Sequence, residues 1–580
     1  MFAVESAAKA ASSVTTMFSE SVFHTEHSSR VFPVLTAMIL VPVAGALLAM
    51  LMPKRRPEYA RIIGYVAMMI TFGMAMFLLL NFKTSQHGYQ FFEQHGWIKS
   101  LGVTFNFGID GIALFMVVLT ALLFPIGLLA SANVDKGRAF TVWMLLLEMS
   151  VIGVFVARDL IAFFVFFELV LVPMYFLIAG WGHGNNAYAA TKFFLYTMAG
   201  SAFLFVAILA LGVLYQRETG DWNFAIGKLT QFAAEAGKIS PGISKLLFVG
   251  FAIAFAVKVP LFPLHTWLPD AHTEAPTAGS VVLAGVMLKM GTYGFIRFAI
   301  PMFPRAAVWA APVMLTVSVI GIIYGAIVAT MQPDLKRLIA YSSVAHLGFV
   351  VMGTFALTTQ GMQGGIFTMV SHGLTTGVLF LIVGMIYERR HTRLIADLGG
   401  LWKSVPVMSG LFLAATFASI GLPGFSGFVG EFTSLVGTFV TRRWWAVAAT
   451  TGVILAAVYL LWAYQRAFTG EPEGDNATMN DISFRELATV VPLLALSLFL
   501  GFYPKPLFDR SEVAVKDLMA HIETSTCGDD HRLGNNNADG TERDCYKEPV
   551  RVAPSEHESE SQTPGEGQNV EIGTEGGEHG

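Results

Sequence analysis

Lys258-Val-Pro-Leu-Phe-Pro-Leu-His265-Thr-Trp-Leu-Pro-Asp270-Ala-His272-Thr-Glu274-Ala-Pro276 is the stretch of this sequence that decides its fold. An apolar run, residues 251–257, leads directly into Lys258. Three prolines then remove backbone donors and disfavour helix before them, so a membrane helix is expected to break just after Lys258. Such breaks are tolerated where protein or water satisfies the freed backbone groups, and transporters use them to place helix ends at ion sites. The plainer alternative is a proline kink in a packing helix, capped by His265.

Composition places this break inside a membrane protein. Of the 580 residues, 54% are hydrophobic and 13% are charged, whereas soluble domains carry about 25% charged residues. The class is therefore an all-α polytopic membrane protein embedded in a lipid bilayer. The net charge of -4 gives no reason to expect nucleic acid as a partner.

A bilayer span needs about 20 apolar residues, and the sequence holds about 14 such runs separated by short polar breaks. The first is expected over residues 31–51, and the long connection at residues 216–244 is expected to carry an amphipathic surface helix. The runs centre near Ile39, Met69, Leu119, Leu147, Phe167, Val206, Ala254, Val286, Val319, Phe349, Leu379, Ala414, Leu455 and Leu494.

Basic residues gather in alternate connections. These are Lys54, Arg55, Arg56 and Arg61, then Lys136 and Arg138, then Lys336 and Arg337, then Arg389, Arg390, Arg393 and Lys403, then Arg466. Because cytoplasmic loops are enriched in Lys and Arg, these connections are expected in the cytoplasm. An even number of spans then predicts that both termini face the periplasm.

The two ends of the chain are polar. Residues 1–30 lack the basic start and apolar run of a signal peptide and read as a polar lead-in. Residues 524–580 are acidic and too polar to offset their ordering entropy, so disorder is expected there. Cys527 and Cys545 are the only cysteines, and they could pair if the tail lies outside the cell. An iron–sulfur cluster normally takes about four thiolates, so this chain is expected to hold none.

A second interruption, Gly421-Leu-Pro423-Gly-Phe-Ser-Gly427-Phe-Val-Gly430-Glu431, again ends in an acid. Two interrupted segments in corresponding positions predict an internally repeated transporter. The predicted division is a lead-in at 1–30, N-terminal helices at 31–136, one five-helix repeat at 137–303, a second at 304–468, a C-terminal helix and flank at 469–523, and a tail at 524–580.

Ionisable side chains recur within the predicted spans: Glu148, Glu168, Lys258, Lys289, His346, His372 and Glu431. Each charge at the bilayer centre costs about 2.5–3.5 kcal/mol on insertion scales, so the series indicates a proton or ion path. Glu168 and Lys258 could form an acid–base pair between neighbouring helices. Each histidine taken singly could equally be a hydrogen-bonded core residue, and Glu148 could face a partner subunit or pair with Arg158. Asp334, Lys336 and Arg337 are expected at a helix start, where the favoured interpretation is surface charge that sets topology.

Three motifs resemble the antiporter-like subunits of respiratory complex I. They are Glu168-Leu-Val-Leu-Val-Pro-Met-Tyr-Phe-Leu-Ile-Ala-Gly-Trp-Gly, the 258–276 stretch, and Asp334-Leu-Lys-Arg-Leu-Ile-Ala-Tyr-Ser-Ser-Val-Ala-His346-Leu-Gly. The stretch Tyr387-Glu-Arg-Arg-His391-Thr-Arg393 and the Glu431 segment narrow the resemblance to the subunit M branch, because sibling subunits have Lys at the Glu431 position. The resemblance covers about residues 31–508.

The resemblance implies 14 core helices in two inverted five-helix repeats, with discontinuous helices at both breaks. It implies an acid–lysine pair at Glu168 and Lys258, a central Lys289, a connecting His372 and a terminal Glu431. His265, His346 and Glu148 are secondary candidates for proton transfer. It also implies a bacterial inner-membrane location and partners that include two sibling subunits. NADH, FMN, iron–sulfur clusters and quinone would lie in other subunits, and this chain would hold no cofactor or metal.

Three other functions remain open from the sequence. The chain could belong to a multi-subunit cation/proton antiporter, or to a membrane-bound hydrogenase or ferredoxin–plastoquinone complex. It could also be a structural spacer whose buried charges merely pair.

Overall fold

The computed structural model describes residues 32–132 and 134–527. The predicted lead-in at 1–30, most of the predicted tail, and the pairing of Cys527 with Cys545 lie outside what these residues can test.

The described chain is a bundle of long apolar helices, which confirms the all-α polytopic fold class. Thirteen helices of the described residues are long and apolar enough to cross a membrane, and a fourteenth apolar helix, Pro406–Ser419, is shorter. Each of the 14 predicted centres lies in one of these helices. Their bounds are α2 (Val34–Leu51), α3 (Pro57–Asn81), α4 (Gly111–Ala130), α5 (Gly137–Val156), α6 (Leu160–Leu169) with α7 (Leu171–Trp181), α8 (Asn186–Thr219), α10 (Pro241–Lys258), α12 to α14 (Thr277–Met302), α15 (Pro304–Thr330), α16 (Leu335–Phe355), α17 (Thr359–Arg390), α19 (Pro406–Ser419), α20 (Ser426–Phe468) and α21 (Phe484–Phe502).

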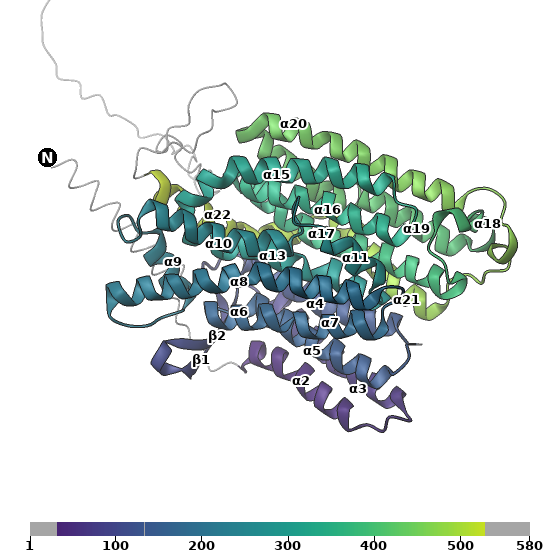
Figure 1. Ribbon diagram of the computed structural model, residues 1–580, viewed down its shortest axis with the longest axis horizontal. Helices are drawn as coiled ribbons and strands as arrows, with labels where there is room; N and C mark the ends of the chain where they lie inside the picture. Colours follow the sequence, from purple (N-terminus) through teal and green to yellow (C-terminus); the bar gives the residue numbers. More distant parts are fainter. Residues whose placement is uncertain (1–31, 133, 528–580) are drawn as a thin grey trace, which may run out of the picture.

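The helices lie side by side along the long axis of the molecule, with α2 and α3 on one flank and α15 and α20 on the other (Figure 1). The apolar windows of α17 and of Thr277–Met302 are 100% buried, and that of α16 is 94% buried, against 33% for α3. The helices that carry Lys289, His346 and His372 are therefore the ones most shielded from lipid.

The first predicted break is present. Helix α10 ends at Lys258, and a turn precedes the short helix α11 (Trp267–Glu274). The indole Nε1 of Trp267 donates to the Val257 carbonyl at 2.9 Å. That bond satisfies a backbone acceptor near the helix end, where the following prolines leave carbonyls without donors.

The second predicted break separates α19 from α20. Gly421 and Gly424 have φ angles of 79° and 102°, which lie in the left-handed region that glycine adopts without strain. At Gly427 a Cβ atom would stand 2.1 Å from the Ala418 carbonyl oxygen, so the two helix ends approach closely only because no side chain is present.

A β-hairpin follows α3, and the sequence analysis did not predict it. Strands β1 (Gln90–Ile98) and β2 (Val103–Ile109) pair antiparallel, and Trp97 stacks on Phe105 at 4.4 Å between ring centroids. The expected surface helix is present nearby as α9 (Ile226–Ala234). Hairpin and α9 lie at the same end of the bundle, opposite the short helix α18 (Leu401–Ser404) (Figure 1). We call this the hairpin end.

The predicted start of disorder at residue 524 is wrong by several residues, because α22 (Lys505–Cys527) continues past it. One face of α22 is apolar and buried through Leu507, Val515 and Ile522. The Arg305 side chain also donates to the Ser525 carbonyl at 3.1 Å. Packing on one face thus orders a helix whose overall composition is polar.

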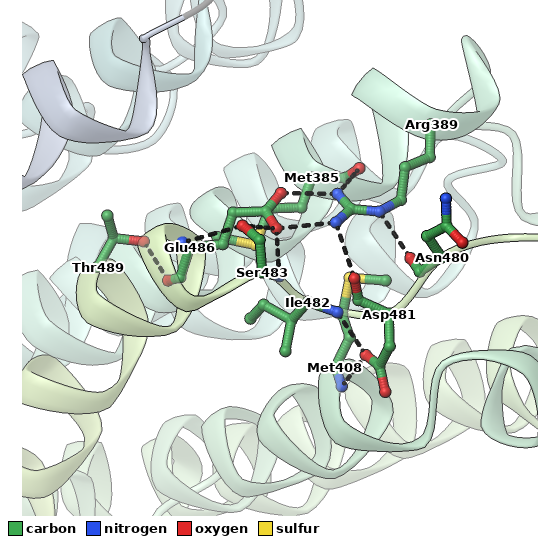
Figure 2. A network of polar contacts seen from close by, with 9 residues as sticks. All are labelled: Met385, Arg389, Met408, Asn480, Asp481, Ile482, Ser483, Glu486 and Thr489. Atoms are coloured by element: carbon green, nitrogen blue, oxygen red, sulfur yellow. Dashed lines mark hydrogen bonds and ion pairs between the residues drawn. The ribbon is translucent and has the colours of Figure 1, made fainter.

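A polar network fixes the end of α17 to α19 and α21 (Figure 2). The Arg389 guanidinium binds both oxygens of Glu486, at 2.7 and 2.8 Å, and its Nε donates to the Asn480 carbonyl at 2.8 Å. The Asp481 carboxylate accepts from the backbone N–H groups of Val407 and Met408 at the start of α19. Ser483 and Glu486 form a capping box on α21.

Substituting Glu486→Gln should destabilise this network. A hydrogen bond to a charged group contributes about 1.5–3 kcal/mol, and the Glu486 side chain is only 8% exposed. We expect a lower thermal denaturation temperature for the detergent-solubilised variant protein. The matched control Glu473→Gln removes the same charge at an exposed position of the adjoining loop. Equal denaturation temperatures for both variants would contradict the expectation.

Candidate functional site

The most buried helices bring Lys289 and His372 into direct contact. The Lys289 Nζ atom lies 2.7 Å from His372 Nδ1, and neither side chain is more than 3% exposed. The same ammonium donates to the Ala284 carbonyl. Ala284 belongs to a π-helical segment, η2 (Leu283–Met287), which widens the helix just before Lys289. Such π segments occur frequently at functional sites.

A second buried contact joins His346 of α16 to Glu431 of α20. His346 Nδ1 lies 2.5 Å from Glu431 Oε1, and both side chains are almost fully buried. The ring of His346 also lies 5.8 Å from that of His372, measured between centroids. The structure therefore brings four predicted residues into one line, in the order Lys289, His372, His346 and Glu431. His346 stands between His372 and Glu431, although the sequence analysis expected it to be only a secondary candidate.

Two hydroxyl groups extend this line, and the sequence analysis missed both. The Tyr459 hydroxyl lies 3.3 Å from His346 Nε2 and 2.7 Å from the Ser342 hydroxyl. Both side chains are buried. Ser342 stands one helical turn before His346 on α16, so the (i, i+4) spacing was the one sequence signal that could have found it.

Glu168 and Lys258 lie near each other without forming an ion pair. The Lys258 ammonium has no hydrogen-bond partner among the described residues, and it lies 4.8 Å from the centroid of the Phe167 ring. The charges of Glu168 and Lys258 still interact across the intervening gap. Glu168 is on α6 and Lys258 is on α10, so the two charges come from different helices, as the sequence analysis expected.

His265 and Glu148 are buried apart from this line. The His265 ring packs against Phe262 and Tyr324, at 5.8 and 5.1 Å between centroids. Neither carboxylate oxygen of Glu148 has a partner among the described residues. Of the two alternatives for Glu148, pairing with Arg158 is therefore wrong, and contact with a partner subunit stays open. Ten residues of helix span about 15 Å, and Arg158 lies beyond the end of α5.

Lys336 is buried, so its interpretation as a surface charge is also wrong. The predicted helix start is present, because the Asp334 carboxylate accepts from the backbone N–H groups of Lys336 and Arg337 at 2.8 and 3.0 Å. However, the Lys336 ammonium turns inward and donates to the Ala275 carbonyl beside the end of α11. The broken helix offers an acceptor there that a sequence reading of α16 alone does not reveal.

His272 is a further buried group that the sequence analysis did not select. Its ring stacks on Phe380 at 4.7 Å, and neither ring nitrogen has a hydrogen-bond partner among the described residues. It experiences the charges of both Lys336 and Lys289, so it lies between the end of α11 and the central line. Its position inside the 258–276 stretch was the sequence signal by which His272 could have been selected as a candidate.

Within residues 32–132 and 134–527, no group of three or more His, Cys, Asp or Glu side chains could hold a metal ion. Independently of that finding, imidazole, ammonium and carboxylate groups in contact are of the kinds that can exchange protons. Fold and site together define a polytopic membrane protein of the antiporter-like class, with broken helices and a buried polar line.

Comparison with known proteins specifies this class. The family described as NADH:quinone oxidoreductase/Mrp antiporter, TM matches residues 157–456. NADH-quinone oxidoreductase subunit M of Rhodobacter capsulatus is 44% identical over 497 residues, which is 84% of this chain and 96% of the relative. NADH-ubiquinone oxidoreductase chain 4 of Arabidopsis thaliana is 42% identical over 500 residues, covering 86% and 99%.

Solved structures give the same result. A chain of respiratory complex I from Thermus thermophilus with bound NADH aligns with a TM-score of 0.75 and 32% identity, covering 85% of this chain and 99% of that one. A chain of the Mrp complex from Dietzia shares the fold alone, with a TM-score of 0.70 and 21% identity. The chain belongs to the family of subunit M of NADH-quinone oxidoreductase.

Replacing the unpaired carboxyl group of Glu148 by an apolar side chain should increase the stability of the protein. An unsatisfied buried polar group costs about 1–3 kcal/mol, and an apolar side chain of similar size avoids that cost. We expect Glu148→Leu to raise the free energy of unfolding, measured by thermal denaturation of the purified complex. Met149→Leu, in the same turn of α5, controls for the introduced leucine. A lower stability for Glu148→Leu alone would reveal a partner for the carboxylate outside this chain.

Proposed function

We propose that this chain is a proton-translocating membrane subunit of NADH-quinone oxidoreductase, and that protons move along Lys289, His372, His346 and Glu431. The observation that carries the proposal is two direct contacts, Lys289 with His372 and His346 with Glu431, whose imidazole rings lie 5.8 Å apart between centroids inside the most buried helices. Ammonium, imidazole and carboxylate groups can each bind and release a proton, so each contacting pair can exchange one directly. Transfer between the two histidines, which share no hydrogen bond, requires a bridging water.

Proton loading of Lys289 is proposed from the end of the bundle opposite the hairpin. Lys336 lies beside the end of α11, and His272 of α11 experiences the charges of both Lys336 and Lys289. No described residue bonds to either ring nitrogen of His272, so the nitrogen without a hydrogen can accept a proton. Release would follow beyond Glu431, on the other side of the membrane.

Glu168 and Lys258 are proposed to act as an electrostatic switch. In an effective dielectric of about 20, two unit charges 4 Å apart interact by about 4 kcal/mol. The gap between the two side chains corresponds to an open pair, and closing it would neutralise the field of Lys258. Phe167 lies over the ammonium in the open arrangement and would have to shift for the pair to close.

The redox chemistry is proposed to lie in partner subunits, which would hold NADH, FMN, iron–sulfur clusters and quinone. Two sibling antiporter-like subunits would adjoin this chain in the membrane arm. The location would be a bacterial inner membrane, with both termini in the periplasm. Residues 137–303 and 304–468 would form two inverted repeats, each containing one broken helix.

Neutralising the central groups should stop proton pumping. We expect Lys289→Met, His372→Ala and Glu431→Gln each to abolish NADH-driven acidification in proteoliposomes that contain the assembled complex. Lys228→Met removes the same charge from an exposed position of α9 and should pump normally. Normal pumping by Lys289→Met would instead support the structural-spacer function.

The proposed switch has its own test. Glu168→Gln or Lys258→Ala should abolish pumping and much of the coupled quinone reduction, because loading of Lys289 would no longer follow the redox step. Quinone reductase activity and pumping are measured on the same assembled complex. Near-normal values of both would exclude the switch. Sodium-dependent transport without NADH oxidation would favour the antiporter function in its place.

A further inference from the structure

A buried cluster of two arginines, one aspartate and one tyrosine closes the hairpin end of the first predicted repeat. We call Asp110, Arg158, Arg297 and Tyr89 the arginine cluster. Arg297 Nη1 forms an ion pair with Asp110 Oδ2 at 2.9 Å. Both guanidinium groups lie over the Tyr89 ring. Arg158 is only 7% exposed, which is unusual for a residue that rarely leaves solvent without a paired acid.

The cluster is held in place by backbone contacts at the hairpin end. The Arg158 N–H donates to the Asn106 carbonyl of β2 at 2.8 Å, and the Arg158 carbonyl accepts from the Ile226 N–H of α9 at 3.0 Å. Asp110 directly follows β2 and caps α4, accepting from the Ala113 N–H at 2.9 Å. Hairpin, α9 and α4 thus all position this charge.

A stripe of polar side chains leads from Arg297 of the arginine cluster toward Lys289. Lys289, Tyr293 and Arg297 recur every fourth residue along α13 (Lys289–Gly294) and the π segment η3 (Phe295–Ala299), which places them on one face. Eight residues of helix span about 12 Å. The Tyr293 hydroxyl donates to the Phe155 carbonyl at 3.0 Å and interacts with the charges of Asp110 and Arg158. This stripe would offer Lys289 a short route to the hairpin end.

The charge of the cluster opposes that route. Two guanidinium groups and one carboxylate leave an excess of positive charge. Burial lowers the pKa of Arg158 to about 9, so its guanidinium stays protonated at neutral pH. Burial also raises the pKa of Asp110, which can only increase the positive excess. Arg158 Nε and Nη1 and Arg297 Nη2 have no hydrogen-bond partner among the described residues. The carboxylate of the adjacent Asp159 is also buried, but it is bound to Thr104 and to the start of α6.

We propose that Arg158 and Arg297 form a fixed positive barrier that keeps protons bound at Lys289 from leaking to the hairpin end. This inference rests on the proposed function of Lys289 as a proton carrier. A fixed unit positive charge about 12 Å from a proton-binding site, in an effective dielectric of about 20, lowers the proton occupancy of that site about tenfold. Fixed positive groups exclude protons from other membrane pores by the same physics.

The barrier is tested by passive proton conductance. The assembled complex, in liposomes without NADH, is given a potassium diffusion potential, and a pH-sensitive dye reports proton flux. Arg158→Gln and Arg297→Gln should each raise the flux about tenfold over the unsubstituted complex. Arg297→Lys keeps the charge and should stay tight. A double variant of Arg297→Gln with Lys289→Met should be tight again, because the route passes through Lys289.

Asp110→Asn separates a charge barrier from a merely structural ion pair. Asparagine still caps α4, but the ion pair with Arg297 is lost while the positive charge rises. A barrier predicts no leak in this variant, whereas a structural role predicts a leak equal to that of Arg297→Gln. The content of this chain in the purified complex is measured for every variant. If the complex with Arg297→Gln does not assemble, the leak of Asp110→Asn is compared with that of Arg158→Gln instead.

The outcomes distinguish the barrier from the proposed function. Proton-tight Arg158→Gln and Arg297→Gln complexes would overturn the barrier, even when Lys289→Met has lost its pumping. A leak in Asp110→Asn equal to that in Arg297→Gln would also overturn it. Normal pumping by Lys289→Met would overturn the proposed function, whatever the flux through the arginine variants.

Discussion

The contact between the Lys289 ammonium and the His372 imidazole is the interaction on which the rest of this structure depends. A charge at that depth is tolerated only where protein surrounds it, and the surrounding helices are the most buried of the bundle. The ammonium needs acceptors, which the His372 ring and the carbonyl of Ala284 supply. The less buried helices on both flanks separate Lys289 from the lipid. Burial of this one charge therefore requires that the helices carrying Lys289 and His372 lie in the middle of the bundle.

Satisfying backbone groups at the two helix breaks is the second constraint. At the first break, Trp267 bonds the Val257 carbonyl, and Lys336 bonds the Ala275 carbonyl. At the second, glycines let α19 and α20 approach closely. Each break also brings an ionisable side chain, Lys258 or Glu431, to a helix end. Backbone carbonyl and N–H groups that would bond to each other within a continuous helix are thus available to buried polar side chains at the breaks.

Much of this arrangement was predictable from the sequence, and the exceptions have physical reasons. Apolar length alone located all 14 runs, and Pro and Gly placed both breaks. The hairpin was missed because its strands, of 9 and 7 residues, fall well below the run of about 20 apolar residues by which the spans were recognised. Lys336 was misplaced because a helix start with adjacent basic residues normally faces solvent. The pairing of Glu148 with Arg158 was wrong because the spacing in the sequence does not show that Arg158 lies beyond the end of α5.

The two π segments on either side of α13 carry a consequence for how this chain can vary. A π segment accommodates one more residue per turn than the flanking α-helix, so the helical phase of Lys289 depends on the exact residue count. Inserting a further residue into Leu283–Met287, which already accommodates an extra one, would rotate everything beyond it by about 100° and turn Lys289 away from His372. This helix is therefore expected to accept changes of side chain far more readily than insertions.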